Sequence, residues 1–250
     1  MTGVVIAGAG VRGLSCGLHL ARAGHRDIRI IDIRAEPGVP TSRPGLMIDH
    51  VCIIDTLESF GIADSQSTPM MIGTGALRRE WLVKSLAIAA SRAGCIISSR
   101  TRLIGAQPMD EGIEVRTVGA GPLSRAPMLS DLLIVAIGVD EEPTEAIEPA
   151  SVSLPDDVRI IREHRPSADL RRWHGTIISH GDQIGRRHIG VRADGTIEAW
   201  STELMQQDCA VLERMRCLGG AEPPTVDDSL SAGHGLADAV LTVLPTAATP

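Results

Sequence analysis

Three glycines near the start of the chain have the spacing of a phosphate-binding loop. Gly8, Gly10 and Gly13 form the pattern G-x-G-x-x-G directly after the apolar run at 4–7. The first glycine permits a tight strand-to-helix turn, the second lets the backbone approach a pyrophosphate, and the third lets the helix pack closely on the sheet. The start of that helix offers N–H groups and the positive end of its dipole to phosphates. The pattern predicts dinucleotide binding, against the alternative of a glycine-rich turn without a ligand.

An acidic residue follows the loop at the place where a ribose would be bound. Asp32 lies in the strand-like run at 28–33, and a carboxylate about 20 residues beyond such a loop accepts the ribose hydroxyl hydrogen bonds. Arg34, two positions later, is a further candidate for cofactor binding. Between the two strands, leucines recur with helical spacing until Gly24, which has the character of a C-cap. We therefore expect one βαβ unit at the N-terminus.

The composition limits the class of protein. The chain has 250 residues, of which 43% are hydrophobic and 22% charged, enough for one large α/β domain or for one with a smaller second domain. No apolar run approaches the roughly 18–20 residues needed to span a bilayer, and the first residues have the pattern of a strand instead of a signal peptide. We expect a cytoplasmic protein without membrane contact. A net charge of −7 and the absence of tyrosine argue against nucleic acid as a partner.

The rest of the chain alternates between helical and strand-like segments, which predicts an α/β fold with a parallel sheet. Helices are expected at 49–60, 79–92, 203–218 and 236–244, with a loop at 219–230. Strands are expected at 95–98, 113–118, 131–137, 175–179, 187–191 and 196–200. The acidic, proline-containing stretch 140–157 is the best candidate for a domain boundary, and Asp194-Gly195 for a hairpin turn.

The N-terminal stretch resembles FAD-dependent monooxygenases of the para-hydroxybenzoate hydroxylase type. The extended glycine motif of that family matches at Gly8, Gly10, Gly13, Leu14, Leu20, Gly24 and His25. The segment from Arg43 resembles the second segment of the family, and Arg79-x-x-Leu82-x-x-x-Leu86 is similar to its R-x-x-L-x-x-x-L helix. Residues 130–136 look like the strand before its D-G motif, of which Gly138 is kept. Residues 231–239 resemble the helix start that closes over the flavin.

The resemblance implies a Rossmann-like FAD-binding domain formed by residues 1–140 and 219–250, with a small β-rich substrate or cap region at 141–218. It implies FAD as cofactor and NAD(P)H as transient co-substrate, which together oxygenate a small organic substrate. It requires neither a protein nucleophile nor a metal, and it assigns no catalytic side chain. The cofactor-binding residues that we expect are Gly8, Gly10, Gly13, Asp32, Arg34, Arg43, Arg79, Gly138, Gly233 and Gly235.

Two alternatives remain open at this point. Ile137 stands where the D-G motif has its aspartate, and the middle of the chain is short. Both features favour a flavoprotein-like scaffold without redox activity, acting as a cyclase, an isomerase or a binding partner of another enzyme. An NAD-dependent dehydrogenase fits Asp32 but leaves Arg79 and residues 231–239 unexplained. Whether the chain forms a homodimer is also open.

Several other residues are better explained by structure than by chemistry. His174, His180 and His188 lie close in sequence, but their spacing on strands does not bring three metal ligands together. His180 and Asp182 are weaker candidates for a substrate pocket and for a displaced family motif. The arginine pairs at 171–172 and 186–187 are expected on solvated faces, although one pair could attract the phosphate of NADPH. Trp173 and Trp200 are expected as core anchors of the small sheet.

Overall fold

A computed structural model describes most of the chain. The described residues are 3–40, 43–62, 72–137, 160–162, 170–179, 188–204 and 211–244.

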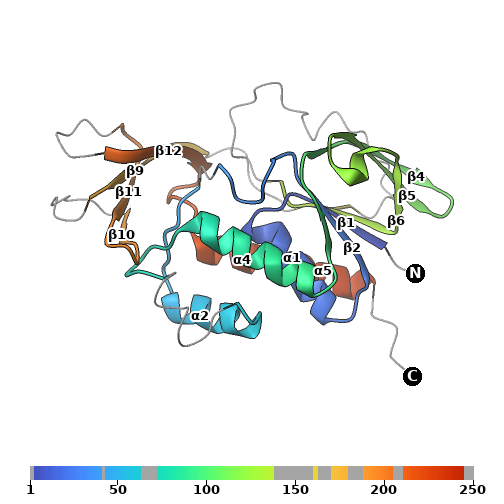
Figure 1. Cartoon of the computed structure of the whole chain (residues 1–250), viewed down its shortest axis with the longest axis horizontal. Coiled ribbons are helices and arrows are strands. Elements are labelled where there is room, and N and C mark those ends of the chain that lie inside the picture. Colours follow the sequence, from blue (N-terminus) through green and yellow to red (C-terminus); the bar gives the residue numbers. More distant parts are fainter. Residues whose placement is uncertain are drawn as a thin grey trace.

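A five-stranded parallel sheet forms the centre of the larger part of the molecule (Figure 1). Its strand order is β3-β2-β1-β7-β8, with β3 at Ile96–Ser98, β2 at Asp27–Ile31, β1 at Gly3–Ala7, β7 at Leu132–Val135 and β8 at Ile160–Arg162. The apolar side chains of β1 alternate between the two faces of the sheet. Val4 and Ile6 pack among the helices, whereas Val5 and Ala7 pack into a separate apolar cluster on the other face. Both faces are therefore covered, as a parallel sheet requires.

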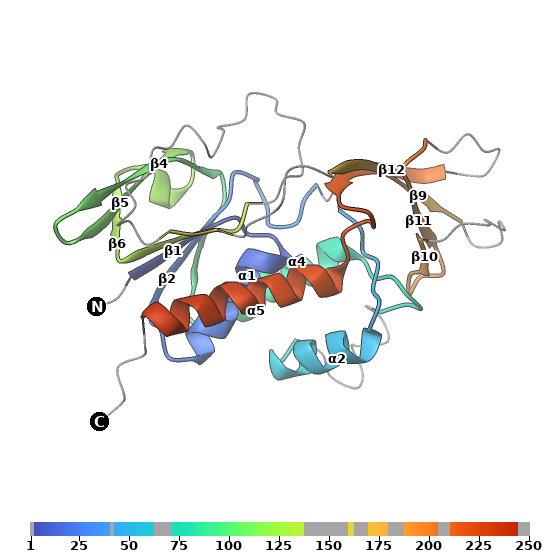
Figure 2. The same ribbon diagram turned by 180° about the vertical axis from the view of Figure 1, so that it is seen from behind.

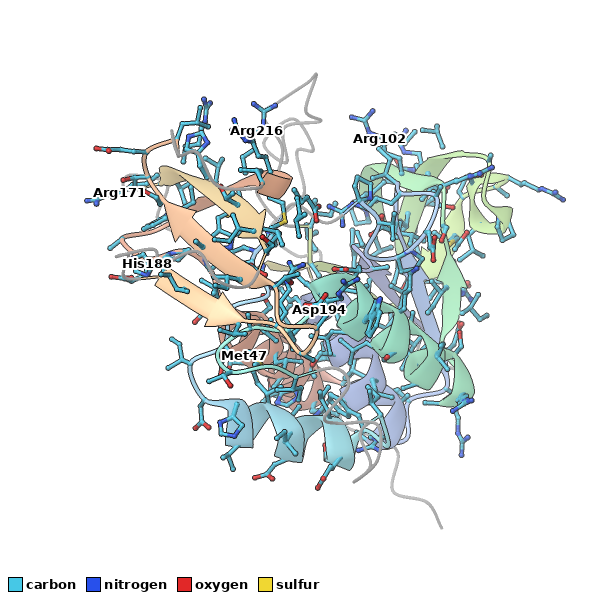
Figure 3. All side chains as sticks on the ribbon, turned by 60° about the vertical axis from the view of Figure 1, so that its left-hand side comes forward. Met47, Arg102, Arg171, His188, Asp194 and Arg216 are labelled. Atoms are coloured by element: carbon cyan, nitrogen blue, oxygen red, sulfur yellow. The ribbon has the colours of Figure 1, made fainter. Side chains whose placement is uncertain are left out.

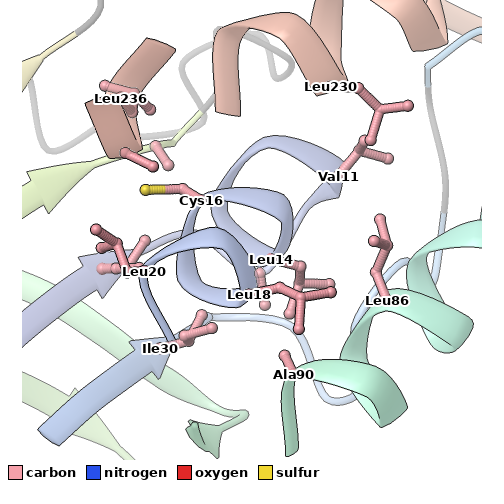
Figure 4. Packing of buried hydrophobic residues seen from close by; sticks show 14 of the residues in the cluster. Val11, Leu14, Cys16, Leu18, Leu20, Ile30, Leu86, Ala90, Leu230 and Leu236 are labelled. Carbon is pink, nitrogen blue, oxygen red and sulfur yellow. The ribbon is translucent and has the colours of Figure 1, made fainter. Parts of the chain in front are cut away.

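Helices cover the first face. They are α1 (Val11–Arg22), α4 (Arg79–Arg92) and α5 (Val226–Val243). A fourth helix, α2 (His50–Ser59), lies farther from the sheet (Figure 1) and adds Ile53 and Leu57 to the same apolar core. The long α5 runs along the back of the molecule against α1 (Figure 2). Leu14 and Leu18 of α1 lie toward Leu86 of α4, while Cys16 lies toward Leu236 of α5 (Figure 4). The helix that carries the glycine loop is thus held between two neighbours.

A three-stranded antiparallel sheet covers the second face. Its strands are β4 (Thr101–Met109), β5 (Gly112–Gly119) and β6 (Met128–Ser130). The chain passes from β6 directly into β7 of the parallel sheet. Ala106, Ile113, Val115 and Met128 pack against Leu133 of β7. Of these strands, the sequence predicts β5 and misses β4 and β6.

A four-stranded antiparallel sheet lies at one end of the molecule (Figure 1), with the order β10-β11-β9-β12. Its strands are β9 (Arg171–Ile178), β10 (His188–Val191), β11 (Ile197–Ser201) and β12 (Val211–Gly219). Trp173 and Trp200 are almost fully buried in a cluster with Leu46 and Ala76, so both are core anchors as expected. Asp194, in the β10–β11 turn, forms a salt bridge with Arg78, the N-cap of α4, and this contact joins the sheet to the helices.

Two predicted elements near the C-terminus are wrong. A helix was expected at 203–218, but residues 211–219 form β12, which pairs with β9 and buries Met215 and Cys217 on one face. The last helix begins at Val226 instead of residue 236, so part of the expected loop at 219–230 is helical. A side-chain cap at Thr225 defines this earlier start.

The predicted fold class is confirmed: a Rossmann-like parallel sheet is combined with a small β-rich region. β8 adds to the parallel sheet although it lies in the range expected for the cap. Among the described residues, no helix has the length and apolar character needed to cross a bilayer.

Candidate functional site

The three glycines of the loop are required for different reasons. Gly8 has a φ of +112°, and a Cβ there would lie 2.8 Å from the carbonyl oxygen of Ala136. A Cβ on Gly13 would lie 1.9 Å from the carbonyl oxygen of Gly8. Gly10, in contrast, has an ordinary extended conformation, and its Cβ position has no neighbour within 4 Å. The fold therefore requires glycine at positions 8 and 13. At position 10 a side chain would meet no protein atom, so the fold does not require glycine there.

The N-terminus of α1 points its backbone donors into that same region. Gly10 is the N-cap and provides no side-chain hydrogen bond, and the first turn holds no acidic residue. The first intrahelical bond runs from the N–H of Leu14 to the carbonyl of Gly10 at 3.0 Å. The N–H groups in the first turn of any helix have no partner within that helix, which is why such helix ends bind anions.

The carboxylate of Asp32 faces the glycine loop and also holds its backbone in place through hydrogen bonds. The residue follows β2 and is 7% exposed. Its Oδ2 accepts a hydrogen bond from the N–H of Ala9 at 2.6 Å, and its Oδ1 accepts one from the N–H of Arg34 at 2.8 Å. A carboxylate has about four acceptor positions, so it retains capacity for ribose hydroxyls. The half-buried Arg34 is thus placed beside the loop through its own backbone.

Arg79 is deeply buried and connects three parts of the fold. Its guanidinium donates to the carbonyl of Pro44 at 2.7 Å and to Oγ of Ser229 at 2.8 Å. Burial lowers the pKa of Arg79 to about 10; Glu198 opposes this shift, while the nearby charges of Arg12 and Arg34 add to it. The side chain stays protonated at neutral pH and holds the chain at residue 44 against α5.

Residues 43–49, which we call the strap, pass between the helices and the four-stranded sheet. Their backbone is held by several elements, and the hydrogen bonds are Gly45 N–H to Glu198, Val226 N–H to Leu46 O, Met47 N–H to Gly75 O, and Ile48 and Asp49 N–H to Asp227. Arg43 begins the strap, and its charge acts on Cys217. Burial raises the pKa of the Cys217 thiol to about 12 despite Arg43 and Arg79, so this cysteine is not a thiolate nucleophile.

A buried ion pair lies where the strap meets the four-stranded sheet. Glu198 of β11 is 0% exposed, and its Oε2 accepts from Nε and Nη2 of Arg192 at 3.0 and 2.7 Å. Its Oε1 accepts from the N–H of Gly45 and from Nε1 of Trp200, both at 2.7 Å. This network is not predicted from the sequence. A glutamate within the apolar strand Ile197–Ser201 was the available signal.

The resemblance placed a helix start at residues 231–239, and the structure corrects this. Gly233 lies inside α5, where it crosses α1: a Cβ there would lie 2.6 Å from the carbonyl of Arg12 and 2.9 Å from Cβ of Ser15. Gly235 is exposed on the same helix. Close helix packing explains Gly233, and neither glycine forms a loop at a helix N-terminus.

The true N-terminus of α5 is closed by the protein itself. Oγ1 of Thr225 accepts from the N–H of Asp228 at 3.1 Å, while Oδ2 of Asp228 accepts from the N–H of Thr225 at 2.9 Å. Asp227, in the same turn, accepts from the strap. Two carboxylates and a complete capping box leave this helix end unsuited to a further anion.

Some of the remaining predicted residues lie outside the described part of the chain, and the others lie in the four-stranded sheet. Gly138, His180, Asp182 and the arginine pair at 186–187 lie outside the described residues. Within the described part of the chain, no group of three histidine, cysteine or acidic side chains is arranged to hold a metal. His188 instead pairs with Glu222 at 3.2 Å. Arg171 projects outward from the four-stranded sheet (Figure 3).

No family model matches the chain, and no curated protein sequence does either. Solved structures do share its fold. A geranylgeranyl bacteriochlorophyll reductase-like protein from Thermoplasma acidophilum aligns with a TM-score of 0.63 and 11% identity, over 96% of this chain and 79% of its own. Glycine oxidase from Bacillus cereus ATCC 14579 aligns with a TM-score of 0.60 and 11% identity, over 97% and 96%.

The anhydrotetracycline hydroxylase OxyS from Streptomyces rimosus is also similar, with a TM-score of 0.58 and 12% identity. The match covers 97% of this chain but 63% of the hydroxylase, so the chain spans less than two thirds of that enzyme. At these identities the similarity establishes the fold. A flavoprotein/dehydrogenase from Cytophaga hutchinsonii has the same Rossmann-like fold, with a TM-score of 0.62 and 10% identity.

Proposed function

We propose that the chain binds FAD and acts as an oxidoreductase of the monooxygenase type, using NAD(P)H to drive oxygenation of a small organic substrate. The observation that carries the proposal is the open space at Gly10, beside an uncapped helix N-terminus without acidic residues. The fold does not need a glycine at this position, whereas a bound pyrophosphate does.

The described residues fit the ADP part of FAD. The first turn of α1 would hold the pyrophosphate, and Asp32 would accept the ribose hydroxyls. Arg12 lies in the first turn of α1 and Arg34 is bonded to Asp32 through its backbone, and their positive charges favour an anion in this region. When bound, the flavin would supply the electron transfer and oxygen activation, for which no protein nucleophile or metal is needed. The role of the chain is to bind and orient the cofactor and substrate.

A visible absorption spectrum tests the proposal most directly. The purified protein would be incubated with FAD, dialysed and compared with an Asp32→Asn variant and untreated protein. We expect a retained flavin spectrum in the wild type and weaker retention in the variant, which keeps the size of the side chain but removes its charge. NADH and NADPH oxidation would then be followed with candidate substrates. A colourless protein that cannot be reconstituted would contradict the proposal.

A flavoprotein-like scaffold without redox activity is the second candidate. It is favoured by the closed N-terminus of α5, where Thr225, Asp227 and Asp228 occupy a helix end that the resemblance assigns to the flavin. This alternative predicts that FAD or ADP binds but that neither NADH nor NADPH is oxidised with any substrate. Consumption of either nucleotide by the FAD-loaded protein would exclude it.

A further inference from the structure

A cavity of about 490 Å³ lies between α2, the chain at residues 72–74 and the end of β10. This volume lies within the range of about 300–1,000 Å³ that is typical of small-molecule sites. The lining combines aliphatic and polar side chains, which are Ile54, Ile72, Val191, His50, Thr74 and Arg192. None of these residues belongs to the glycine loop or to its carboxylate.

The wall of the cavity is a built contact between two segments that are distant in sequence. A Cβ on Gly73 would lie 2.0 Å from the carbonyl oxygen of Val191, so the glycine lets the two backbones touch. The N–H of Val191 donates to the carbonyl of Thr74 at 2.8 Å. The strap is hydrogen-bonded to the same segment, since the N–H of Met47 donates to the carbonyl of Gly75 at 2.9 Å, so the wall has a defined shape.

Arg192 gives this wall a guanidinium whose positive charge is compensated by Glu198. The side chain is 6% exposed, and both Nε and Nη2 donate to Oε2 of Glu198. Glu198 is fully buried, so its charge is opposed by Arg192 and not by solvent. A buried pair of this kind is stable only while both charges remain, because each compensates the desolvation of the other.

We propose that this cavity binds a small, uncharged organic molecule that combines an apolar body with an oxygen acceptor. The aliphatic walls favour an apolar body, and polar side chains at the wall suit a hydroxyl or carbonyl oxygen. A carboxylate would lose its hydration next to a cation that Glu198 already neutralises, so it binds more weakly. The arginine therefore does not select acids. That this ligand is the substrate of the oxidoreductase rests on the proposed function, whereas the binding itself does not.

Calorimetric titration with two ligands of the same shape tests this preference. The probes are 2-naphthol, neutral at pH 8, and 2-naphthoate, which is anionic. We expect the wild type to bind naphthol at least about tenfold more tightly than naphthoate. In Glu198→Gln the cation of Arg192 is no longer compensated, so the ratio of the two affinities should shift toward naphthoate by at least about tenfold. A wild type that prefers naphthoate, or a ratio that the variant leaves unchanged, would overturn the proposal.

Two further variants keep the test decisive if Glu198→Gln fails to fold. The double variant Arg192→Gln/Glu198→Gln removes both charges and should keep the preference for naphthol. Ile54→Trp fills the cavity from α2 and should abolish binding of both probes. Far-ultraviolet circular dichroism and the thermal denaturation midpoint report whether each variant retains the wild-type fold. Unchanged binding in Ile54→Trp would place the ligand elsewhere and refute the proposal. If naphthol binds but FAD does not, the proposed function fails and the cavity assignment stands.

Discussion

The N-termini of α1 and α5 belong to two helices that cross in contact, yet they are built in opposite ways. At α1, Gly10 provides no side-chain cap and the first turn has no acidic residue. At α5, Thr225 and Asp228 form a complete capping box, and Asp227 adds a second carboxylate. Both ends carry the same dipole, so the difference lies in what satisfies their donors. The first end is open to an external anion, whereas the second is satisfied by the chain.

The N-terminus of a helix thus has two different roles in this protein, one at α5 and the other at α1. Asp227 accepts hydrogen bonds from Ile48 and Asp49, so the closed end of α5 anchors the strap. The open end of α1 faces Asp32, whose carboxylate already orders the loop through Ala9. The backbone of the glycine loop is thus held in place by Asp32, and no side chain of Gly10 caps the helix that follows. This is the arrangement that an anionic ligand requires.

The largest expected effect is the loss of stability in Gly13→Ala, near the N-terminus of α1. The new Cβ would collide with the carbonyl of Gly8, and that atom belongs to the backbone and cannot rotate away. We expect a loss of stability of about 3 kcal/mol or more, measured by urea denaturation. Gly235→Ala is a matched control, because its Cβ position is empty and the residue is exposed on α5. Equal stability of the two variants would show that the close approach at Gly13 is not needed.

Gly10→Ala should separate binding from stability. Its Cβ meets no protein atom, so we expect the unfolding free energy to change by less than about 1 kcal/mol. The same methyl group would occupy the space of a pyrophosphate, and the affinity for ADP should fall at least about tenfold. Calorimetric titration with ADP measures this change. Unaltered affinity would remove the main support for a nucleotide at this end of α1.

At the closed end, Thr225→Ala should have the reverse pattern. Loss of the cap should lower the unfolding free energy by about 1 kcal/mol, and ADP affinity should not change. Thr242→Ala, in the last turn of the same helix, provides the control, because its exposed hydroxyl donates to the carbonyl of Ala239 within the helix. A fall in ADP affinity in Thr225→Ala would indicate that the two helix ends are not independent.

The open end could be predicted from the sequence, whereas the closed end could not. The glycine spacing, the preceding apolar strand and Asp32 all lie in one continuous stretch, so local rules suffice. At α5, Gly233 and Gly235 favour a loop, but Gly233 is tolerated because it lies at a helix crossing. The cap uses Asp228 in the position where glutamate is usual, which weakens the signal.

Strand β12 and the buried ion pair were missed because their causes are not local. β12 lies at the edge of its sheet, and consecutive residues from Leu212 to Arg214 are exposed near an irregularity in pairing. This hides the alternation that Met215 and Cys217 show further along. Glu198 is satisfied by Gly45, Arg192 and Trp200, and only the tertiary fold brings the strap to the four-stranded sheet.

The smallest expected effect is a pH dependence at the α1–α5 contact. The rings of His19 and His234 lie 5.2 Å apart, Phe60 packs against His234, and Arg22 lies over Phe60. Burial lowers the pKa of His234 below its ordinary value of 6.5; His19 lowers it further, and Asp238 partly offsets this. The unfolded chain therefore binds this proton more strongly than the folded chain.

The stability that His234 contributes is complete above pH 6.5 and is lost as the pH falls through its folded-state pKa. Denaturation midpoints measured between pH 8 and pH 5 should therefore decrease less in His234→Gln than in the wild type. Part of the decrease should persist, because burial also lowers the pKa of His25. His50→Gln changes an exposed histidine at the start of α2 and should retain the wild-type decrease. If His234→Gln and His50→Gln behave alike, the contact between α1 and α5 does not respond to protonation of His234.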